Sequence, residues 1–466
     1  MTFNRGSMAS LFLPNLEFEE ELSGSAASGS ALKQQRLRDL EPVMAHLSEN
    51  PADVVLTDPL ALPDDLPPCL ETVRFLSEKD VRGRSLTGCR LVPWGWSPRA
   101  VHLADRLGLG TARPTAEAVR QANSRRFLVP RDLIVSLPGI PDCGRLTWLA
   151  AGSPEDDSDT EVAAAAAAAT AAAAAADVPA EPVLFSTPCD SVDAVVASLA
   201  RFRANSVEEW VIKAEFSHAA RNRILGRGSR LSEPHLNWLR RRFSRSEIVV
   251  AEPWVQRIAE CGLQFEIGPA NDIAGGPLQD EHSSEAGTIR FDGAALLIND
   301  AAGRYIGSLV ASVPGTSRLW RPAVRHGFRL SRELQRAGYF GWLGIDCMVF
   351  RAADGQSFLR LSHDLNARCT MGRIALRMKR LMEPGELGFW CHLPAELLTR
   401  EPGGRERISS VWQPADSVCT VCTSPRRIGQ RPAKTLTALL TSSDPDELLH
   451  CAQHVRELQQ TRTTGL

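Results

Sequence analysis

The sequence predicts an α/β fold, because short apolar runs alternate with segments of helical spacing along most of the chain. The first such run is Ala52 to Leu56, and the clearest is Leu91 to Trp94. The second run is followed by Ser97 and Pro98, a helix cap with proline in the first turn, and then by the helical segment Ala100 to Leu109. Strand, tight turn and helix in this order are typical of an open sheet, where ligands bind at the carboxyl ends of the strands.

Composition and charge exclude several classes of protein. The chain has 466 residues and a mass of 50.8 kDa, enough for two or more domains. Its apolar fraction of 43% is ordinary for a soluble globular protein, and its net charge of −2 gives no field that would attract nucleic acid or a membrane surface. The 11 cysteines follow no repeating frame, and the apolar stretch Leu11 to Leu13 is too short for a leader or a membrane span. We therefore expect a cytoplasmic protein with reduced thiols.

A marked change of composition separates two parts of the chain. An acidic, serine-containing segment, Ser153 to Glu161, leads into the alanine tract Ala163 to Ala176. Such a tract has high helix propensity but no large side chain to bury. The sequence therefore predicts a linker or a solvent-exposed helix between residues 152 and 182, with no chemistry of its own.

Helices and short strands alternate again beyond this linker. The spacing of apolar residues predicts helices over Ser191 to Phe202 and Ser232 to Phe243. Short apolar runs predict strands over Trp210 to Ala214, Glu247 to Ala251 and Gly293 to Ile298. This order again indicates an α/β arrangement.

Lys213 is the most informative charge in this part of the sequence. Lysine occurs only at positions 33, 79, 213, 379 and 434, whereas arginine is abundant, so a lysine in the middle of the chain is less likely to be arbitrary. Lys213 lies at the end of a predicted strand and precedes a loop of small and basic residues that begins at Ser217. An ammonium group in this place can reach phosphates while the backbone N–H groups of the loop fold over them.

A second candidate segment follows the predicted strand Glu247 to Ala251. It consists of Glu252, Pro253, Trp254 and Val255, and an extended segment of this kind can offer backbone groups and a carboxylate to the edge of an adenine ring. Glu260 lies a few residues further on and can accept hydrogen bonds from ribose hydroxyls.

A predicted hairpin late in the chain carries the strongest pattern. Two apolar runs, Cys347 to Phe350 and Phe358 to Leu361, are joined by a turn at Asp354-Gly355. If they pair, Asp346 and Asp364 both lie toward the open end of the hairpin.

The oxygens at this open end suit a magnesium ion. Asn366 is two residues from Asp364, so on an extended backbone both side chains project from the same face. Mg²⁺ prefers a few carboxylate and amide oxygens and leaves its other positions to water and nucleotide, and Arg368 can neutralise a phosphate that the metal does not reach. The alternative is an exposed hairpin with ordinary turn chemistry.

Together these segments resemble one family, the ATP-grasp superfamily, which includes biotin carboxylase, carbamoyl-phosphate synthetase and D-alanine–D-alanine ligase. The resemblance covers roughly Asn123 to Met378, and its strongest part is Asp364-Leu365-Asn366-Ala367-Arg368, which is similar to the family's Glu-x-Asn-x-Arg. The sequence departs from the family in having Asp364 where glutamate is usual and Arg125 where lysine is usual.

The resemblance implies roles for individual residues. It implies that Asp346, Asp364 and Asn366 bind Mg²⁺ and that Arg368 and Lys213 are catalytic. It implies that ATP is held by the following set: Arg125, Lys213, Ser217, Glu252, Trp254, Val255 and Glu260.

The resemblance also implies an organisation and an activity. The expected parts are a Rossmann-like pre-ATP-grasp α/β domain at 1–122, the start of the ATP-grasp region at 123–151, the linker at 152–182, the nucleotide-binding and catalytic region at 183–400, and a mixed segment at 401–466. The implied reaction is the Mg²⁺- and ATP-dependent ligation of a carboxylate to an amine, both small molecules, through an acyl-phosphate. A phosphotransferase on the same fold and a nucleotide-binding protein without turnover remain alternatives.

Three smaller features have competing explanations. The basic segment Arg221 to Arg245 is either a nucleic-acid surface or, as we expect, a solvated face. The pair Cys419 and Cys422 is either half of a zinc site or, as we expect, part of a strand. His218 and His363 lie beside the candidate segments, where an isolated histidine more often satisfies local hydrogen bonds than binds a ligand.

Overall fold

The structure is a computed structural model. It describes residues 9–24, 31–82, 86–137, 186–216, 222–270, 289–311, 318–400, 406–408 and 417–463. The alanine-rich linker, Ser217 and His218 lie outside the described residues, so the predictions that concern them stay predictions. The expected α/β class is confirmed, since one parallel sheet and a much larger antiparallel sheet are both present.

The N-terminal part is a four-stranded parallel sheet in the order β4-β2-β1-β5. Its strands are β1 (Ala9–Leu13), β2 (Val54–Thr57), β4 (Arg74–Ser77) and β5 (Cys89–Pro93). Helix α4 (Pro98–Arg106) follows β5 directly, and its Ser97 cap accepts a hydrogen bond from the backbone N–H of Ala100, as the sequence predicted. All of these strands are parallel, so their carboxyl ends lie together at one edge of the sheet, where a ligand can bind.

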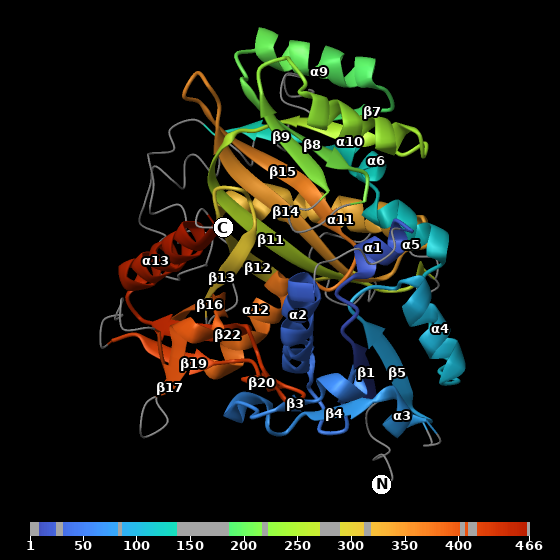
Figure 1. Ribbon diagram of the computed structural model, residues 1–466, viewed down its shortest axis with the longest axis vertical. Helices are drawn as coiled ribbons and strands as arrows, with labels where there is room; N and C mark the ends of the chain where they lie inside the picture. The colour runs from blue at the N-terminus through green and yellow to red at the C-terminus, as the bar shows by residue number, and fades with distance from the viewer. Residues whose placement is uncertain are drawn as a thin grey trace.

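Several short elements precede, connect or follow these strands in the sequence. They are α1 (Phe18–Leu22), α2 (Ala31–Leu40), η1 (Glu41–Leu47), η2 (Pro59–Ala61), β3 (Pro63–Asp64), η3 (Pro68–Leu70), α3 (Glu78–Val81), α5 (Ala116–Asn123), α6 (Arg125–Leu128) and η4 (Val129–Arg131). Figure 1 shows them in blue and cyan beside the larger sheet.

A second, smaller sheet lies above the large one in Figure 1. It has the antiparallel order β7-β10-β8-β9, with strands β7 (Thr187–Cys189), β8 (Glu209–Ala214), β9 (Arg223–Arg227) and β10 (Val249–Pro253). Helices α9 (Val192–Ala204) and α10 (Glu233–Phe243) pack on it through a core that includes Phe202, Trp210 and Leu239. The predicted strand Glu247 to Ala251 is therefore displaced by two residues, and Glu252 lies within β10 rather than after it.

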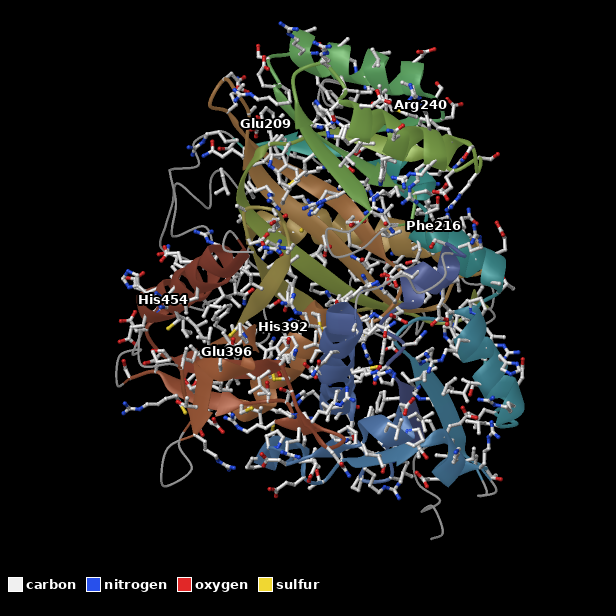
Figure 2. The ribbon with its side chains drawn as sticks, in the orientation of Figure 1. Glu209, Phe216, Arg240, His392, Glu396 and His454 are labelled. Atoms are coloured by element: carbon white, nitrogen blue, oxygen red, sulfur yellow. The ribbon has the colours of Figure 1, made fainter. Side chains whose placement is uncertain are left out.

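The arginines of α10 behave as a solvated face. Arg240 and Arg241 are exposed, and Figure 2 labels Arg240 on this helix. Arg240 pairs with Glu233 at 3.2 Å, and Arg242 pairs with Glu247 at 2.8 Å. Ion pairs of this exposed kind contribute little to stability.

The centre of the molecule is a nine-stranded sheet in the order β19-β22-β16-β13-β12-β11-β14-β15-β6. Its strands are β6 (Ile134–Ser136), β11 (Gln256–Ile267), β12 (Ile289–Asn299), β13 (Tyr305–Ala311), β14 (Gly341–Arg351), β15 (Ser357–Asn366), β16 (Leu387–Pro394), β19 (Cys419–Cys422) and β22 (Thr435–Ser442). Helices α11 (Arg321–Arg336), α12 (Met371–Arg377) and α13 (Pro445–Thr463) pack against it. Short elements complete this part: η8 (Arg318–Trp320), η9 (Met378–Leu381), η10 (Ala395–Leu397), β17 (Leu398–Arg400), β18 (Glu406–Ile408), β20 (Arg427–Ile428) and β21 (Arg431–Pro432).

The C-terminal segment is an integral part of this architecture. Strand β22 pairs with β16 and β19 pairs with β22, so the expectation that Cys419 and Cys422 belong to a strand is confirmed. Strand β20 pairs with β3 of the N-terminal part, which joins regions more than 350 residues apart in the sequence. The sequence pattern of this segment was too mixed to predict these pairings.

Gly307 is required where β13 crosses β16. A Cβ atom at this position would lie 2.5 Å from the backbone oxygen of Trp390 and 2.9 Å from the Cα of Cys391. Since a backbone cannot move aside as a flexible side chain can, we expect Gly307→Ala to lower the free energy of unfolding by about 1–3 kcal/mol in urea titrations. Gly110→Ala, where a Cβ would meet nothing within 4 Å, is the matched control. Equal unfolding midpoints for the two variants would contradict this explanation.

Candidate functional site

The two predicted metal-binding carboxylates lie directly opposite each other. Asp346 on β14 is the register partner of Asp364 on β15, as the hairpin pattern predicted. Nδ2 of Asn366 donates a hydrogen bond to Oδ2 of Asp346 at 3.1 Å. The strands are longer than predicted, so these three residues lie within the paired strands and not in a loop beyond them. A paired backbone holds them more firmly than a loop would.

The carboxylates of Asp346 and Asp364 repel each other. Burial raises the pKa of Asp346 to about 7, and the charge of the neighbouring Asp364 contributes to this rise. A bound cation would relieve this repulsion and favour the ionised form.

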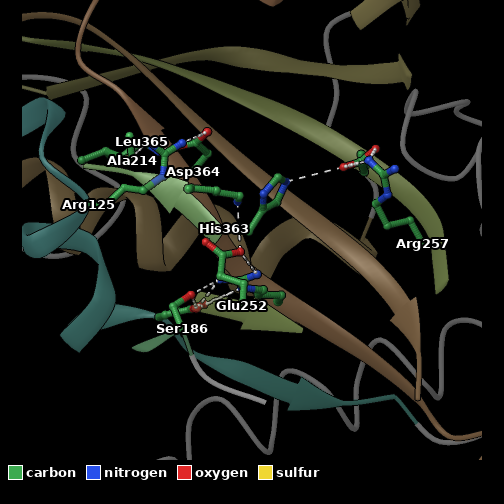
Figure 3. Close-up of polar contacts among 12 residues, drawn as sticks. Arg125, Ser186, Ala214, Glu252, Arg257, His363, Asp364 and Leu365 are labelled. Carbon is green, nitrogen blue, oxygen red and sulfur yellow. Dashed lines mark hydrogen bonds and ion pairs between the residues drawn. The ribbon is translucent and has the colours of Figure 1, made fainter. Parts of the chain in front are cut away.

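Arg125 connects this acid pair to the smaller sheet. Its Nη2 donates to both oxygens of Asp364, at 3.2 and 3.0 Å, and its Nη1 donates to the backbone oxygen of Ala214 at 3.2 Å. Ala214 is the last residue of β8 and follows Lys213, so Arg125 brings the lysine-bearing strand and the acidic strand together (Figure 3). The sequence predicted Arg125 as a nucleotide-binding residue but gave no sign of its contact with Asp364.

Lys213 is held by a buried carboxylate. Its Nζ lies 3.0 Å from Oε2 of Glu252, which also accepts from Nη1 of Arg360 at 3.1 Å. Burial alone would raise the pKa of Glu252, but the charges of Lys213 and Arg360 outweigh it and lower this pKa to about 2. Glu252 is therefore ionised at neutral pH, and its carboxylate fixes the position of the lysine.

Arg360 is the centre of the buried polar group that includes Glu252, although the sequence pattern did not predict a role for it. Its guanidinium contacts three side chains: Glu252, Asp132 (Nε to Oδ1, 2.9 Å) and Ser186 (Nη2 to Oγ, 2.6 Å). Its side chain and that of Asp132 are 4% and 1% exposed. The signal in the sequence is a single arginine inside the apolar run Phe358 to Leu361, which would be buried and therefore must be paired.

The other predicted nucleotide-binding residues occupy three different environments. Trp254 lies beneath Arg223 and Arg257, whose guanidinium carbons are 5.3 and 4.7 Å from the ring centroid. Val255 packs against a small cluster that contains Met348 and Phe350.

Glu260 is already engaged by neighbouring polar side chains. It accepts hydrogen bonds from Arg257 at 3.2 Å and from Asn299 at 2.7 Å. Nε2 of His363 is 3.7 Å from Glu260 and has no hydrogen-bond partner among the described residues. Burial and the charges of Lys213 and Arg360 hold the pKa of His363 well below its usual value, so this imidazole is neutral at pH 7.

Arg223, Arg257 and Arg304 form a positively charged group that the sequence analysis did not identify. Burial lowers the pKa of Arg223, and the charges of Arg257 and Arg304 lower it further. The carboxylate of Asp300 pairs with Arg304 at 2.5 Å and offsets part of this charge. Such a group of cations favours a multiply charged anion.

Arg368 lies between the acid pair and the N-terminal part. It donates to Oδ1 of Asn366 at 2.9 Å, forms an ion pair with Glu19 of α1, and lies over the ring of Trp94 at 5.9 Å. Trp94 is buried, and its backbone oxygen accepts a hydrogen bond from the N–H of Cys369 at 2.7 Å. Glu19 was not among the predicted site residues.

The donor set at Asp346 and Asp364 fits Mg²⁺. In the part of the chain that the structure describes, no group of three or more histidine, cysteine, aspartate or glutamate side chains could hold a metal ion. Mg²⁺ needs only one or two carboxylates when substrate phosphates and water complete its shell. The amide oxygen of Asn366 accepts a hydrogen bond from Arg368 in this structure, and its second lone pair is left for the ion.

Comparison with known proteins identifies similar solved structures only. No protein-family model and no curated protein match the chain. N5-carboxyaminoimidazole synthetase from Staphylococcus aureus is 10% identical, over 98% of this chain and 100% of that chain, with a TM-score of 0.47. Biotin carboxylase from Campylobacter jejuni is 10% identical, over 92% and 86%, with a TM-score of 0.42. Pyruvate carboxylase from Rhizobium etli is 13% identical, with a TM-score of 0.47. The match covers 96% of this chain but only 37% of that protein.

TM-scores below 0.5 carry no argument about activity, and the function must be argued from the residues of this chain. Within the described residues, no helix is long and apolar enough to cross a membrane.

Proposed function

We propose that this chain binds MgATP and joins a carboxylate to an amine through an acyl-phosphate, as an enzyme of the ATP-grasp type. The observation that carries the proposal is the arrangement around Arg125. This one side chain contacts Asp364 of the predicted metal site and the backbone next to Lys213, the predicted phosphate-binding residue. The two halves of the site were predicted from segments about 150 residues apart, and a triphosphate bound beside Arg125 would reach both.

Each proposed role follows from charge and position. Asp346 and Asp364 would hold Mg²⁺, which when bound neutralises phosphate charge as the terminal phosphoryl group is transferred. Lys213, fixed by Glu252, and Arg125 would bind the phosphates. Trp254 and Val255 would contact the nucleotide base, as the resemblance implies.

The proposed reaction has two steps, in which these residues bind and orient the reactants. A carboxylate oxygen of the substrate attacks the terminal phosphorus of ATP and ADP leaves. The amine nitrogen then attacks the carbonyl carbon of the acyl-phosphate, phosphate leaves, and the nitrogen loses a proton. Arg368, beside the acid pair, would stabilise the negative charge of the transferring group.

A product assay tests the activity. With MgATP and candidate carboxylates and amines, a ligase releases ADP and phosphate only when both substrates are present. A stable phosphorylated product with one substrate would show a phosphotransferase instead. If MgATP raises the melting temperature but no pair of substrates yields ADP, the protein binds nucleotide without turnover. A thermal-shift screen with MgATP and amino acids selects the pairs to assay.

A further inference from the structure

A cavity of about 500 Å³ lies at the carboxyl edge of the N-terminal parallel sheet. It is bounded by the ends of β1 and β2, by α4 and by α2, and Figure 1 shows α2 and α4 on either side of β1 and β5. None of the residues of the candidate active site lines it. Its size is that of a small-molecule site, and the carboxyl edge of a parallel sheet is where such sites occur.

Side chains of both charges line this cavity. Its acidic residues are Glu17, Glu41, Asp58 and Glu78, and its arginines are Arg38, Arg99 and Arg106; the charges of Arg99 and Arg38 act on Glu41. Neither Arg38 nor Arg99 is buried. Neither arginine forms an ion pair or a side-chain hydrogen bond with another described residue, and the same is true of Glu41. The structure thus holds charged groups of both signs close together without joining them to one another.

Glu41 is partly buried, whereas Arg38, Asp58 and Arg99 are exposed. Burial raises its pKa to about 8, although the charges of Arg99 and Arg38 act in the opposite direction, and Asp58 and Glu17 raise it further. At neutral pH without a ligand this carboxyl therefore carries a proton for most of the time. A cationic ligand group beside it would favour the ionised form, so binding would release a proton.

The charged groups of the cavity differ in how far they are already engaged. Glu78, which also lines it, is paired with Arg106. Oδ1 of Asp58 accepts a hydrogen bond from the backbone N–H of Leu60, and its other oxygen is left for a ligand. Leucine side chains, among them Leu16 and Leu56, also line the cavity. A ligand that fits must present a cation to three carboxylates, an anion to two arginines, and a small apolar body.

We propose that this cavity binds a compact zwitterion of the α-amino acid class, with its ammonium group on the carboxylates Glu17, Glu41 and Asp58 and its carboxylate on Arg38 and Arg99. The inference goes beyond the proposed ATP-dependent reaction and does not depend on it, because the two sites share no residue.

Isothermal titration calorimetry of the full chain, without nucleotide, tests the proposal. Each of the twenty common amino acids is titrated singly at pH 7. We expect at least one to bind, with N-acetylation or amidation of that amino acid weakening binding at least tenfold, since each removes one of the two charges. The measured enthalpy should depend on the ionisation enthalpy of the buffer, because Glu41 releases a proton on binding.

Variants then locate the site. Glu41→Gln and Arg99→Gln should each weaken binding at least tenfold, while Glu71→Gln, an exposed glutamate outside the cavity, should bind as the wild type does. The thermal shift by MgATP should be the same in all of them. The proposal is overturned if no amino acid binds, or if both cavity variants bind with wild-type affinity. Failure of the MgATP shift in the wild type would instead contradict the proposed function and leave this result unaffected.

Discussion

Asp364→Ala is expected to abolish the part of the stabilisation by ATP that depends on Mg²⁺. The reason is that Mg²⁺ would lose one of its two protein carboxylates and keep only Asp346. At a ligand concentration of about 100 times Kd, specific binding stabilises the native state by about 2.7 kcal/mol, which a thermal-shift measurement resolves easily. The measurement compares ATP with and without Mg²⁺ for each protein, so each variant serves as its own reference.

The control must separate loss of the metal from loss of fold. Asp364→Ala also removes the partner of Arg125, whose side chain is 7% exposed, so the variant will be less stable before any ligand is added. Asp354→Ala, in the exposed turn between β14 and β15, removes a carboxylate from the same hairpin without touching the acid pair. It should keep the full Mg²⁺-dependent shift. An Asp364→Ala protein that keeps this shift would show that the ion binds elsewhere or not at all.

The acid pair could be predicted from the sequence because its determinants are local. The turn at Asp354-Gly355 and the apolar runs on both sides of it fix the pairing of adjacent strands, and this pairing alone places Asp346 opposite Asp364. The strand, turn and helix from Leu91 to Leu109 were predicted for a similar reason, since the cap at Ser97 marks where a strand gives way to a helix.

The contacts that complete the site could not be predicted in this way. Arg125 and Asp364 are 239 residues apart, and Arg360 and Asp132 are 228 apart. No periodicity within one segment determines which side chains meet across such distances. The sequence therefore identified Lys213 and Glu252 as separate contacts for phosphate and adenine, whereas in the structure they form one ion pair.

Arg360→Met is expected to lower the free energy of unfolding by about 3–5 kcal/mol, because it leaves two buried carboxylates without their shared partner. Arg360 contacts Asp132 and Glu252, and all three side chains are 5% exposed or less. Methionine fills a similar volume, so the loss comes from charge and not from a cavity. Urea titration measures it, and Arg332→Met, an exposed arginine on α11, should change stability by less than about 0.5 kcal/mol.

The dependence of stability on pH identifies which carboxylate is affected. In the wild type, the pKa of Glu252 is lowered from 4.5 to about 2, so this group contributes stability that is present above pH 4.5 and is lost as the pH falls toward 2. Without Arg360, burial acts against a weaker opposing charge, the pKa of Glu252 rises, and the acid-dependent loss becomes smaller. The double variant Arg360→Met/Asp132→Asn should recover part of the stability at pH 7, since it removes the carboxylate that loses its ion pair, whereas Glu252 keeps Lys213. If Arg360→Met instead unfolds with the stability and acid profile of the wild type, the buried group does not join β15 to β10, and Lys213 would need another explanation for its position.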